Sequence, residues 1–285
     1  MSSFSTTENS SDFLQSNSLI AKLSFLLLVL LLFMVLLRFG IRLVTWIFSP
    51  NKTPHLMDGM IDATQQSVFI QDPSGADGTV TTIYRSENSK DGLEFTWSVW
   101  LKITNFEYLA GKYRHVFYKG NSKYLPNGMN SPNNAPGLYI APHTNALVVV
   151  MNTFNDIQQE VVIPDIPINL WVNVILRCEN QTLDVFINGS IAKSVNLHGI
   201  PKQNYGDVYV AANGGFEGNI ADLWYWNYSL GTREIQRIAN LGPNTKLVKG
   251  SAGSSDTYGY DYLSLRWFFK GPGDAYNPYP MHSKH

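Results

Sequence analysis

One uncharged apolar run near the N-terminus constrains this chain more than any other feature. The run from Leu23 to Leu37 reads LSFLLLVLLLFMVLL, and Lys22 and Arg38 stand on either side of it. Counted from Leu19, the apolar stretch is 19 residues long. As an α-helix it would extend roughly 28 Å at 1.5 Å per residue, which matches the roughly 30 Å hydrocarbon core of a bilayer. The sequence therefore predicts a transmembrane helix.

A cleaved signal peptide and a buried core helix are the two alternative explanations of such a run. A signal peptide begins with basic residues and ends at a site of small residues. The polar tail at 1–18 contains acidic but no basic residues, and no such cleavage site follows the run. We therefore predict an uncleaved single-pass anchor that occupies 19–48, including an interfacial extension. Its anchoring residues are Leu23, Leu30, Leu37 and Arg38.

The charges beside the anchor predict which side of the membrane the rest of the chain occupies. Arg38, Arg42 and Lys52 all lie on the C-terminal flank, and basic flanks favour the cytosolic side. The single Cys178 agrees, because oxidising compartments more often contain paired cysteines. Sequons such as the one at Asn188 point the other way, since they can be glycosylated in secreted proteins. We predict the cytosolic side, with the extracellular or lumenal side as the alternative.

The composition of the 285 residues excludes several classes of protein. The formal net charge is −1 and only 15% of the residues are charged, against about 25% in ordinary soluble domains. A chain this close to neutral has no broad basic face for nucleic acid, so we expect no nucleic-acid partner. A single cysteine also excludes an internal disulfide framework and a multi-cysteine zinc site.

Beyond the anchor, apolar and polar residues alternate with the period of β-strands. In the stretch 95–104, Phe95, Trp97, Val99 and Leu101 share one face. Further strands are expected at 147–151, 171–178, 183–187, 191–197, 207–211 and 220–228, and a short helix is expected at 232–240. Many short strands separated by turns predict an all-β fold, an antiparallel β-sandwich.

Changes in composition along the chain predict its domain boundaries. A short linker at 49–55 follows the membrane segment, and the sandwich domain is expected at 56–249. Within it, the Asn-, Pro- and Gly-rich stretch at 121–136 predicts a long loop. A Gly/Ser linker and an aromatic C-terminal tail occupy 250–285.

Three motifs in the sandwich region carry a resemblance to a known family. In order, they are FTWSVWLKI at 95–103, LWVNVIL at 170–176 with LDVFING at 183–189, and GNIADLWYW at 218–226 with SLGTREI at 229–235. Together they resemble the laminin-G-like branch of the concanavalin A-like lectin/glucanase superfamily. The resemblance implies a concanavalin A-like jelly roll that buries its motif tryptophans, Trp171 among them.

The sequence lacks the residues that catalysis in this superfamily uses. Members that cut β-glucans carry a Glu-X-Asp-X-Glu strand, in which carboxylates act as nucleophile and general acid, and no such triplet occurs here. The sequence also contains no G-x-S-x-G, H-E-x-x-H or Walker-type loop. Cys178 alternates with Val174 and Leu176 and is expected to be a small buried residue. We therefore predict that the protein is not an enzyme and needs no cofactor.

The predicted binding residues serve two kinds of ligand. Calcium, which many relatives bind at the rim of the sandwich, needs six to eight oxygen ligands. The calcium candidates are Asp72, Asp77 and Asp156, although none lies in a recognisable calcium loop. A sugar or a protein partner would instead contact aromatic side chains beside polar neighbours. The candidate contact residues are Tyr124, Tyr139, Tyr205, Trp100 and Trp226.

Two functions remain open after these exclusions. The first is a non-catalytic structural or protein-interaction module, anchored in the lipid bilayer and in contact with neighbouring membrane or capsid proteins. It follows from the stretches 166–171, 199–209 and 213–218, which are most similar to membrane-anchored laminin-G-like proteins of large DNA viruses. The second is a membrane-displayed lectin-like module that binds glycans, with or without calcium.

Leu30→Arg tests the anchor, because it places a charge at the centre of the predicted span. Such a charge costs about 2.5–3.5 kcal/mol of insertion free energy. We expect the variant to lose stable membrane association, measured as the fraction that remains in the membrane pellet after carbonate extraction. A variant that still pellets completely would contradict the predicted anchor.

Overall fold

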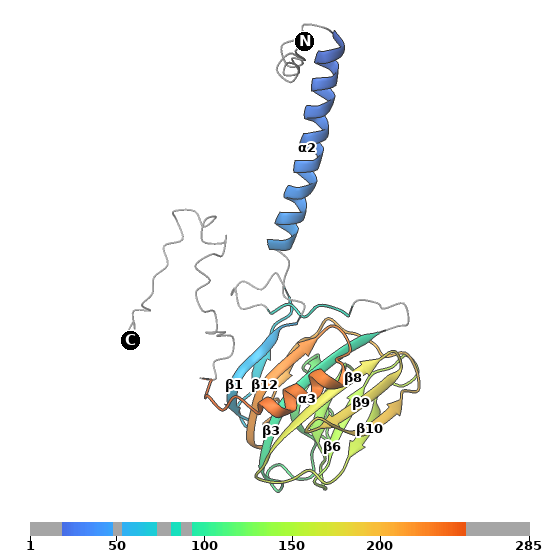
Figure 1. Ribbon diagram of the computed structural model, residues 1–285. Coiled ribbons are helices and arrows are strands. Elements are labelled where there is room, and N and C mark those ends of the chain that lie inside the picture. The colour runs from blue at the N-terminus through green and yellow to red at the C-terminus, as the bar shows by residue number, and fades with distance from the viewer. Residues whose placement is uncertain (1–18, 48–52, 73–80, 87–92, 249–285) are drawn as a thin grey trace, which may run out of the picture. The chain divides into compact units, whose positions relative to one another are not determined.

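The computed structural model describes residues 19–47, 53–72, 81–86 and 93–248 (Figure 1). The chain divides into two compact units, Met1–Asn51 and Lys52–His285. The polar tail expected at 1–18 and the aromatic tail expected at 250–285 lie outside the described residues. Asp77, one of the calcium candidates, also lies outside them.

The first unit contains α2 (Leu19–Ile47), a helix of 29 residues that includes the predicted membrane segment. By length and apolar composition it can cross a membrane. Nearly all of its side chains are exposed, whereas an apolar helix of a soluble core is buried. Arg38 and Arg42, expected on the flank of the apolar run, belong to the same continuous helix.

The second unit is a sandwich of two antiparallel sheets, each six-stranded in the described part of the chain (Figure 1). In spatial order, sheet A contains β1 (His55–Asp62), β12 (Glu217–Trp226), β3 (Glu94–Asn105), β8 (Trp171–Glu179), β9 (Thr182–Ile187) and β10 (Ser190–Asn196). Sheet B contains β2 (Ser67–Phe69), β11 (Asp207–Val210), β4 (Arg114–Gly120), β5 (Gly137–Ile140), β6 (Leu147–Met151) and β7 (Gln159–Ile163). The predicted all-β sandwich, preceded by one apolar helix, is confirmed.

The alternating stretches of the sequence all form strands, as predicted. The stretches at 95–104, 171–178 and 220–228 correspond to β3, β8 and β12, which are neighbours in sheet A. The sequence did not predict β1, β2, β4, β5 and β7. Strands β4 and β5 are buried on both faces, so they lack the alternation on which the prediction rests.

The main core lies between the two sheets, and one face of β3 runs through its length. Phe95, Trp97, Val99, Leu101 and Ile103 point into this core, and none is more than 3% exposed. This confirms the predicted apolar face of the strand. Fully burying a large apolar side chain contributes about 1.5–3 kcal/mol, so this face is a major source of stability.

The opposite face of β3 is buried at Thr96, Ser98 and Trp100, and α3 (Thr232–Leu241) lies over the outer side of sheet A (Figure 1). Ile235 of this helix packs against Ile175 of the sheet. The hydroxyl of Thr96 accepts the backbone N–H of Leu230 (3.0 Å), in the segment that leads into α3. The predicted helix is therefore confirmed, and it lies over a face that carries polar side chains.

A second, smaller core covers the outer side of sheet B. Tyr118, Tyr139 and Met129 are large members of it and are 1% exposed or less. Met129 belongs to the predicted loop at 121–136, and Asn134 of the same loop accepts a hydrogen bond from the Tyr139 hydroxyl. The long loop is therefore folded back onto the sheet.

Buried amide side chains hold this loop in place without any charge. The side chain of Asn152 donates to the backbone oxygens of Pro132 (2.5 Å) and Ile157 (2.7 Å). Its side-chain oxygen accepts the backbone N–H of Asn134. A buried polar group without a partner costs about 1–3 kcal/mol, so these bonds explain the asparagine-rich composition of the region.

The structure corrects one expectation about the core. Trp171 is the first residue of β8, opposite Lys102 of β3, and it is half-buried rather than enclosed. Its neighbour Val172 points into the main core instead, because successive side chains on a strand face opposite ways. Cys178 is fully buried as predicted, and burial raises the pKa of its thiol to about 12.

Trp97→Ala and Trp171→Ala separate the enclosed tryptophan from the half-buried one. Truncating a fully buried tryptophan costs about 3–5 kcal/mol, and we expect this loss for Trp97. We expect a smaller loss for Trp171, since water already reaches part of its ring. Chemical denaturation of the full-length protein in detergent micelles, followed by near-ultraviolet circular dichroism, measures both. Equal losses would contradict the core described above.

Candidate binding pocket

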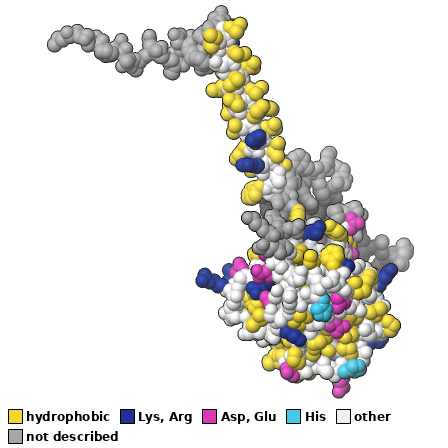
Figure 2. Space-filling view, turned by 90° about the vertical axis from the view of Figure 1, so that its right-hand side faces the viewer, with side chains coloured by type: hydrophobic (Ala, Val, Ile, Leu, Met, Phe, Trp, Pro, Cys, Tyr) yellow, Lys and Arg dark blue, Asp and Glu magenta, His cyan; other side chains and the backbone are white. Residues whose placement is uncertain are grey.

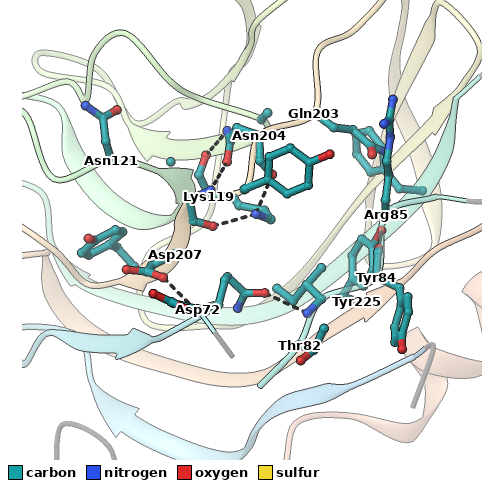
Figure 3. A pocket seen from close by; sticks show the side chains of 18 of the residues that line it. Asp72, Thr82, Tyr84, Arg85, Lys119, Asn121, Gln203, Asn204, Asp207 and Tyr225 are labelled. Atoms are coloured by element: carbon teal, nitrogen blue, oxygen red, sulfur yellow. Dashed lines mark hydrogen bonds between the residues drawn. The ribbon is translucent and has the colours of Figure 1, made fainter. Parts of the chain in front are cut away.

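A cavity of about 740 Å³ lies where both sheets meet segments outside the strands (Figure 3). Strands β3 and β12 of sheet A contribute to its lining, as do β4 and β11 of sheet B. The remaining described walls come from the segments 82–85 and 203–206 and from residues beside the ends of β2 and β4. The cavity therefore joins residues that are far apart in the sequence, and most of its described lining lies outside the strands.

Aromatic side chains form the apolar part of the lining. Phe95, Trp97 and Tyr225 each border the cavity and are 4% exposed or less. The ring centroids of Trp97 and Tyr225 are 4.8 Å apart. The Tyr225 hydroxyl donates to the backbone oxygen of Tyr84 (2.7 Å), and burial raises the pKa of this phenol. The aromatic side of the cavity is therefore rigid and uncharged.

Lys119 is the most deeply buried charged residue of the lining, at 8% exposure. Its ammonium group donates to the backbone oxygens of Asn204 (2.9 Å) and Gly206 (2.6 Å). Burial lowers the pKa of Lys119 to about 8, against the opposing attraction of Asp207. An ammonium group carries three N–H donors, so one donor has no hydrogen bond among the described residues.

Amide side chains supply acceptors that lack donors. The Gln203 side chain donates to the Ser86 hydroxyl (2.9 Å), but its oxygen accepts no hydrogen bond among the described residues and is buried. The side-chain oxygen of Asn121, also on a lining residue, is buried without a donor in the same part of the chain. Buried acceptors are almost always hydrogen-bonded, so these two oxygens are exceptions among the lining residues.

The charges of the lining are balanced. Among the described lining residues, the negative charges of Asp72 and Asp207 equal in number the positive charges of Lys119 and Arg85, all four of which are labelled in Figure 3. The carboxylate of Asp207 accepts the backbone N–H of Gln71 (2.8 Å), which fixes its orientation. A cavity without a large net charge selects ligands by hydrogen bonding and shape rather than by long-range attraction.

Only some of the predicted binding residues line the cavity. Tyr205 lies on its lining with 85% of its surface exposed, and Asp72 lines it as well. Tyr124 is 39% exposed, but it packs edge-on against His115 on the outer side of sheet B. Trp226 is half-buried and stacks on Trp224, close to α3.

Two of the predicted contact residues need correction. Trp100 is 6% exposed and Tyr139 is fully buried. Neither offers an aromatic surface to a partner, and Tyr139 belongs to the second core, to which Met129 of the loop at 121–136 contributes. The sequence pattern does not show this, since both residues occupy strand positions that an open sandwich would expose.

The predicted calcium ligands are not brought together in the described residues. Asp72 lines the cavity, whereas Asp156 is not on its lining and lies 3.7 Å from the imidazole of His198. A different group of metal-binding side chains does converge in the described part of the chain. It consists of His55, Asp58 and Asp222, and its ligand atoms lie within 4.8 Å of one another.

Most of the cavity leaves no mark in the local sequence. Lys119 stands inside the buried strand β4, whose sequence is RHVFYKG, and a lysine beside the apolar residues of a strand is a signal that could have marked it. Gln203 and Asn204 lie in GIPKQNYGD, where the residues resemble an ordinary loop. Nothing in their local pattern shows that they meet β4, because the contact spans more than eighty residues of sequence.

Comparison with known proteins identifies the fold of this region. A laminin-G family profile described as the concanavalin A-like lectin/glucanases superfamily matches residues 74–236. No curated protein matches the chain. The matched residues contain all three motifs on which the sequence-based resemblance rests.

Among solved structures, the similar ones include domains of botulinum neurotoxins. The receptor binding domain of the C/D mosaic serotype is 13% identical, with a TM-score of 0.41 over 52% of this chain and 36% of that chain. The binding domain of neurotoxin DC in complex with rat synaptotagmin II is 16% identical, with a TM-score of 0.40 over 57% of this chain and 39% of that chain. This chain thus matches well under two thirds of either neurotoxin structure.

The burial of Lys119 predicts a particular dependence of stability on pH. Because its pKa falls from 10.5 to about 8 in the fold, the folded protein releases this proton at lower pH than the unfolded chain does. Between these values the unfolded chain binds more protons, so the free energy of unfolding rises with pH. A shift of this size corresponds to about 3 kcal/mol.

Lys119→Met removes the titrating group but keeps much of the side-chain volume. We expect the free energy of unfolding of the wild type, relative to that of the variant, to rise between pH 8 and 10.5. Urea denaturation of both proteins across this pH range measures the two free energies of unfolding. Subtracting one from the other removes the contribution of the tyrosines, which both proteins share. Parallel curves for the two proteins would contradict a lowered pKa of Lys119.

Proposed function

The chain belongs to the concanavalin A-like lectin/glucanases superfamily, and we propose that its sandwich is a membrane-anchored, non-catalytic module that binds a glycan in the cavity shown in Figure 3. The observation that carries the proposal is a lysine N–H without an acceptor among the described residues, that of Lys119, on the same lining as the exposed ring of Tyr205. A saccharide presents hydroxyl groups that both donate and accept, and it presents C–H groups that pack against apolar walls. Small-molecule sites combine these same features.

The unmet donor in the cavity has a complement on a sugar ring. The third N–H of Lys119 can donate to a hydroxyl or ring oxygen of a saccharide. The exposed ring of Tyr205 adds an aromatic face beside the cavity. The balanced charge of the described lining favours a neutral ligand.

The proposal that the module is not an enzyme rests on its carboxylates. Glycoside hydrolysis needs two carboxyl groups on either side of the scissile bond, and the sequence lacks the Glu-X-Asp-X-Glu strand. In the cavity, the carboxylate of Asp207 accepts the backbone N–H of Gln71 and attracts the ammonium group of Lys119. These contacts give Asp207 a role in holding the cavity walls.

Glycan binding outside the cell requires the sandwich on the extracellular or lumenal side, the alternative that the sequence left open. Asn188 of the sequon Asn-Gly-Ser is exposed at the turn between β9 and β10, so a glycosyltransferase could reach it. Asn227 of another sequon is buried, at 6% exposure. Asn188 is therefore the better reporter of this orientation.

A second function, docking of a protein partner, is favoured by an exposed apolar cluster. Phe154, Ile157 and Ile200 are each more than half exposed. The backbone N–H of Phe154 donates to the backbone oxygen of Ile200 (3.0 Å), which places these two residues side by side. In this alternative the sandwich faces the cytosol and contacts a neighbouring membrane or capsid protein, as the resemblance to viral proteins implies.

Tyr205→Ala tests the glycan site. We expect the wild-type protein, displayed in detergent micelles on a glycan array, to bind at least one neutral saccharide. Loss of the Tyr205 ring should weaken binding about tenfold, which corresponds to about 1.4 kcal/mol. Isothermal titration with the saccharide found on the array measures the affinity of both proteins.

Tyr124→Ala is the matched control, because Tyr124 is an exposed tyrosine that does not line the cavity. We expect this variant to bind like the wild type. No binding to any saccharide, or equal losses for both variants, would overturn the glycan proposal. Protection of the sandwich from added protease in sealed microsomes, with glycosylation at Asn188, would support it, whereas cytosolic exposure would favour protein docking.

A further inference from the structure

Three side chains with metal-binding atoms meet at an edge of sheet A. His55 and Asp58 come from β1, and Asp222 comes from the neighbouring strand β12. None of them lines the cavity described above. His55 Nε2 lies 3.4 Å from Asp222 Oδ1, and His55 Nδ1 lies 4.0 Å from Asp58 Oδ1. The pairing of β1 with β12 brings these three residues together.

Neighbouring groups hold each of the three side chains in position. The imidazole of His55 stacks on the Trp224 ring, with centroids 3.7 Å apart and planes 13° from parallel. Asn244 donates its backbone N–H to Asp222 Oδ2 (2.5 Å) and its side-chain amide to Asp58 Oδ1 (2.9 Å). Donors of this kind, one shell outside the ligands, orient the ligands of metal sites.

One atom of the cluster lacks a suitable partner in the described residues. His55 Nε2 is buried, and its contact with Asp222 does not have the geometry of a hydrogen bond. Two carboxylates face this imidazole, and the side chain of Asp222 is only 12% exposed. A cation between the nitrogen and the carboxylates would satisfy the nitrogen and offset both negative charges.

We propose that His55, Asp58 and Asp222 bind one divalent cation of the zinc type. One imidazole and two carboxylates form a ligand set that suits zinc, with a fourth position for water. Calcium is a poorer fit, because it takes six to eight oxygen ligands. This site is independent of the proposed glycan site and shares no residue with it.

The bound ion would stabilise the edge of sheet A by linking two of its strands. Strand β1 pairs with β12 on one side, and on the other side Met60 exchanges backbone hydrogen bonds with Lys246 (2.7 Å) and Val248 (2.9 Å). An ion held by β1 and β12 would link both strands, and through Asn244 it would also steady the segment that leads to Val248. Zinc binding should therefore raise the melting temperature of the sandwich.

Metal titration of the full-length protein tests the proposal. The protein in detergent micelles is stripped with a chelator and then titrated with Co²⁺, whose visible absorption reports its ligands. Zn²⁺ affinity is measured by competition with a chromophoric chelator. We expect one ion per chain at this site, and we expect Asp58→Asn to weaken zinc binding about tenfold or more. Calcium in excess should not displace the ion.

His198→Ala is the matched control, because His198 also pairs with an aspartate, Asp156, at 3.7 Å. We expect it to bind zinc like the wild type, whereas His55→Ala should abolish the Co²⁺ absorption. Asp58, whose side chain is 45% exposed, serves as the second variant if His55→Ala does not fold by circular dichroism. Unchanged binding in folded His55→Ala or Asp58→Asn, or no binding by the wild type, would overturn the proposal.

Discussion

The burial of β3 on both faces is the constraint on which the rest of the sandwich depends. One face supplies the main core, and its first residues, Phe95 and Trp97, also form the aromatic side of the cavity. The other face must be covered, because its tryptophan, Trp100, is apolar and its hydroxyl groups need partners. The segment before α3 meets the second need at Thr96, since Leu230 donates its N–H to the Thr96 hydroxyl. The cavity thus borders the main core through Phe95 and Trp97.

The low charge of the chain has a structural reason. Amide side chains, rather than ion pairs, satisfy the buried backbone of the long loop, as Asn152 does for Pro132 and Ile157. On the face shown in Figure 2, charged side chains are scattered among apolar and neutral ones. The buried cations Lys119 and Arg114 donate to backbone oxygens, whereas the buried carboxylate of Asp184 pairs with Arg177 (2.7 Å). A surface of this kind favours ligands recognised by hydrogen bonds at short range.

Much of the fold was predictable, and most of the candidate sites were not. The alternation of 95–104 identified β3 and the face that it buries, and the pattern of 232–240 identified α3. The same alternation could not show that Trp100 is buried, because a local pattern does not show which distant segment packs on a face of the strand. It also left β4 unrecognised, since a strand buried on both faces has no polar side to mark it.

By itself, the sequence determined the apolar helix and the two-layered β-sandwich, because both follow from residue patterns that repeat locally. A long apolar run can satisfy its backbone only as a helix in lipid, and a stripe of period two must pack against another layer. Tertiary structure alone decided which polar groups meet. The cavity joins Lys119 to Asn204 and the proposed cation site joins His55 to Asp222. Such contacts depend on strand order and register, which no local pattern specifies.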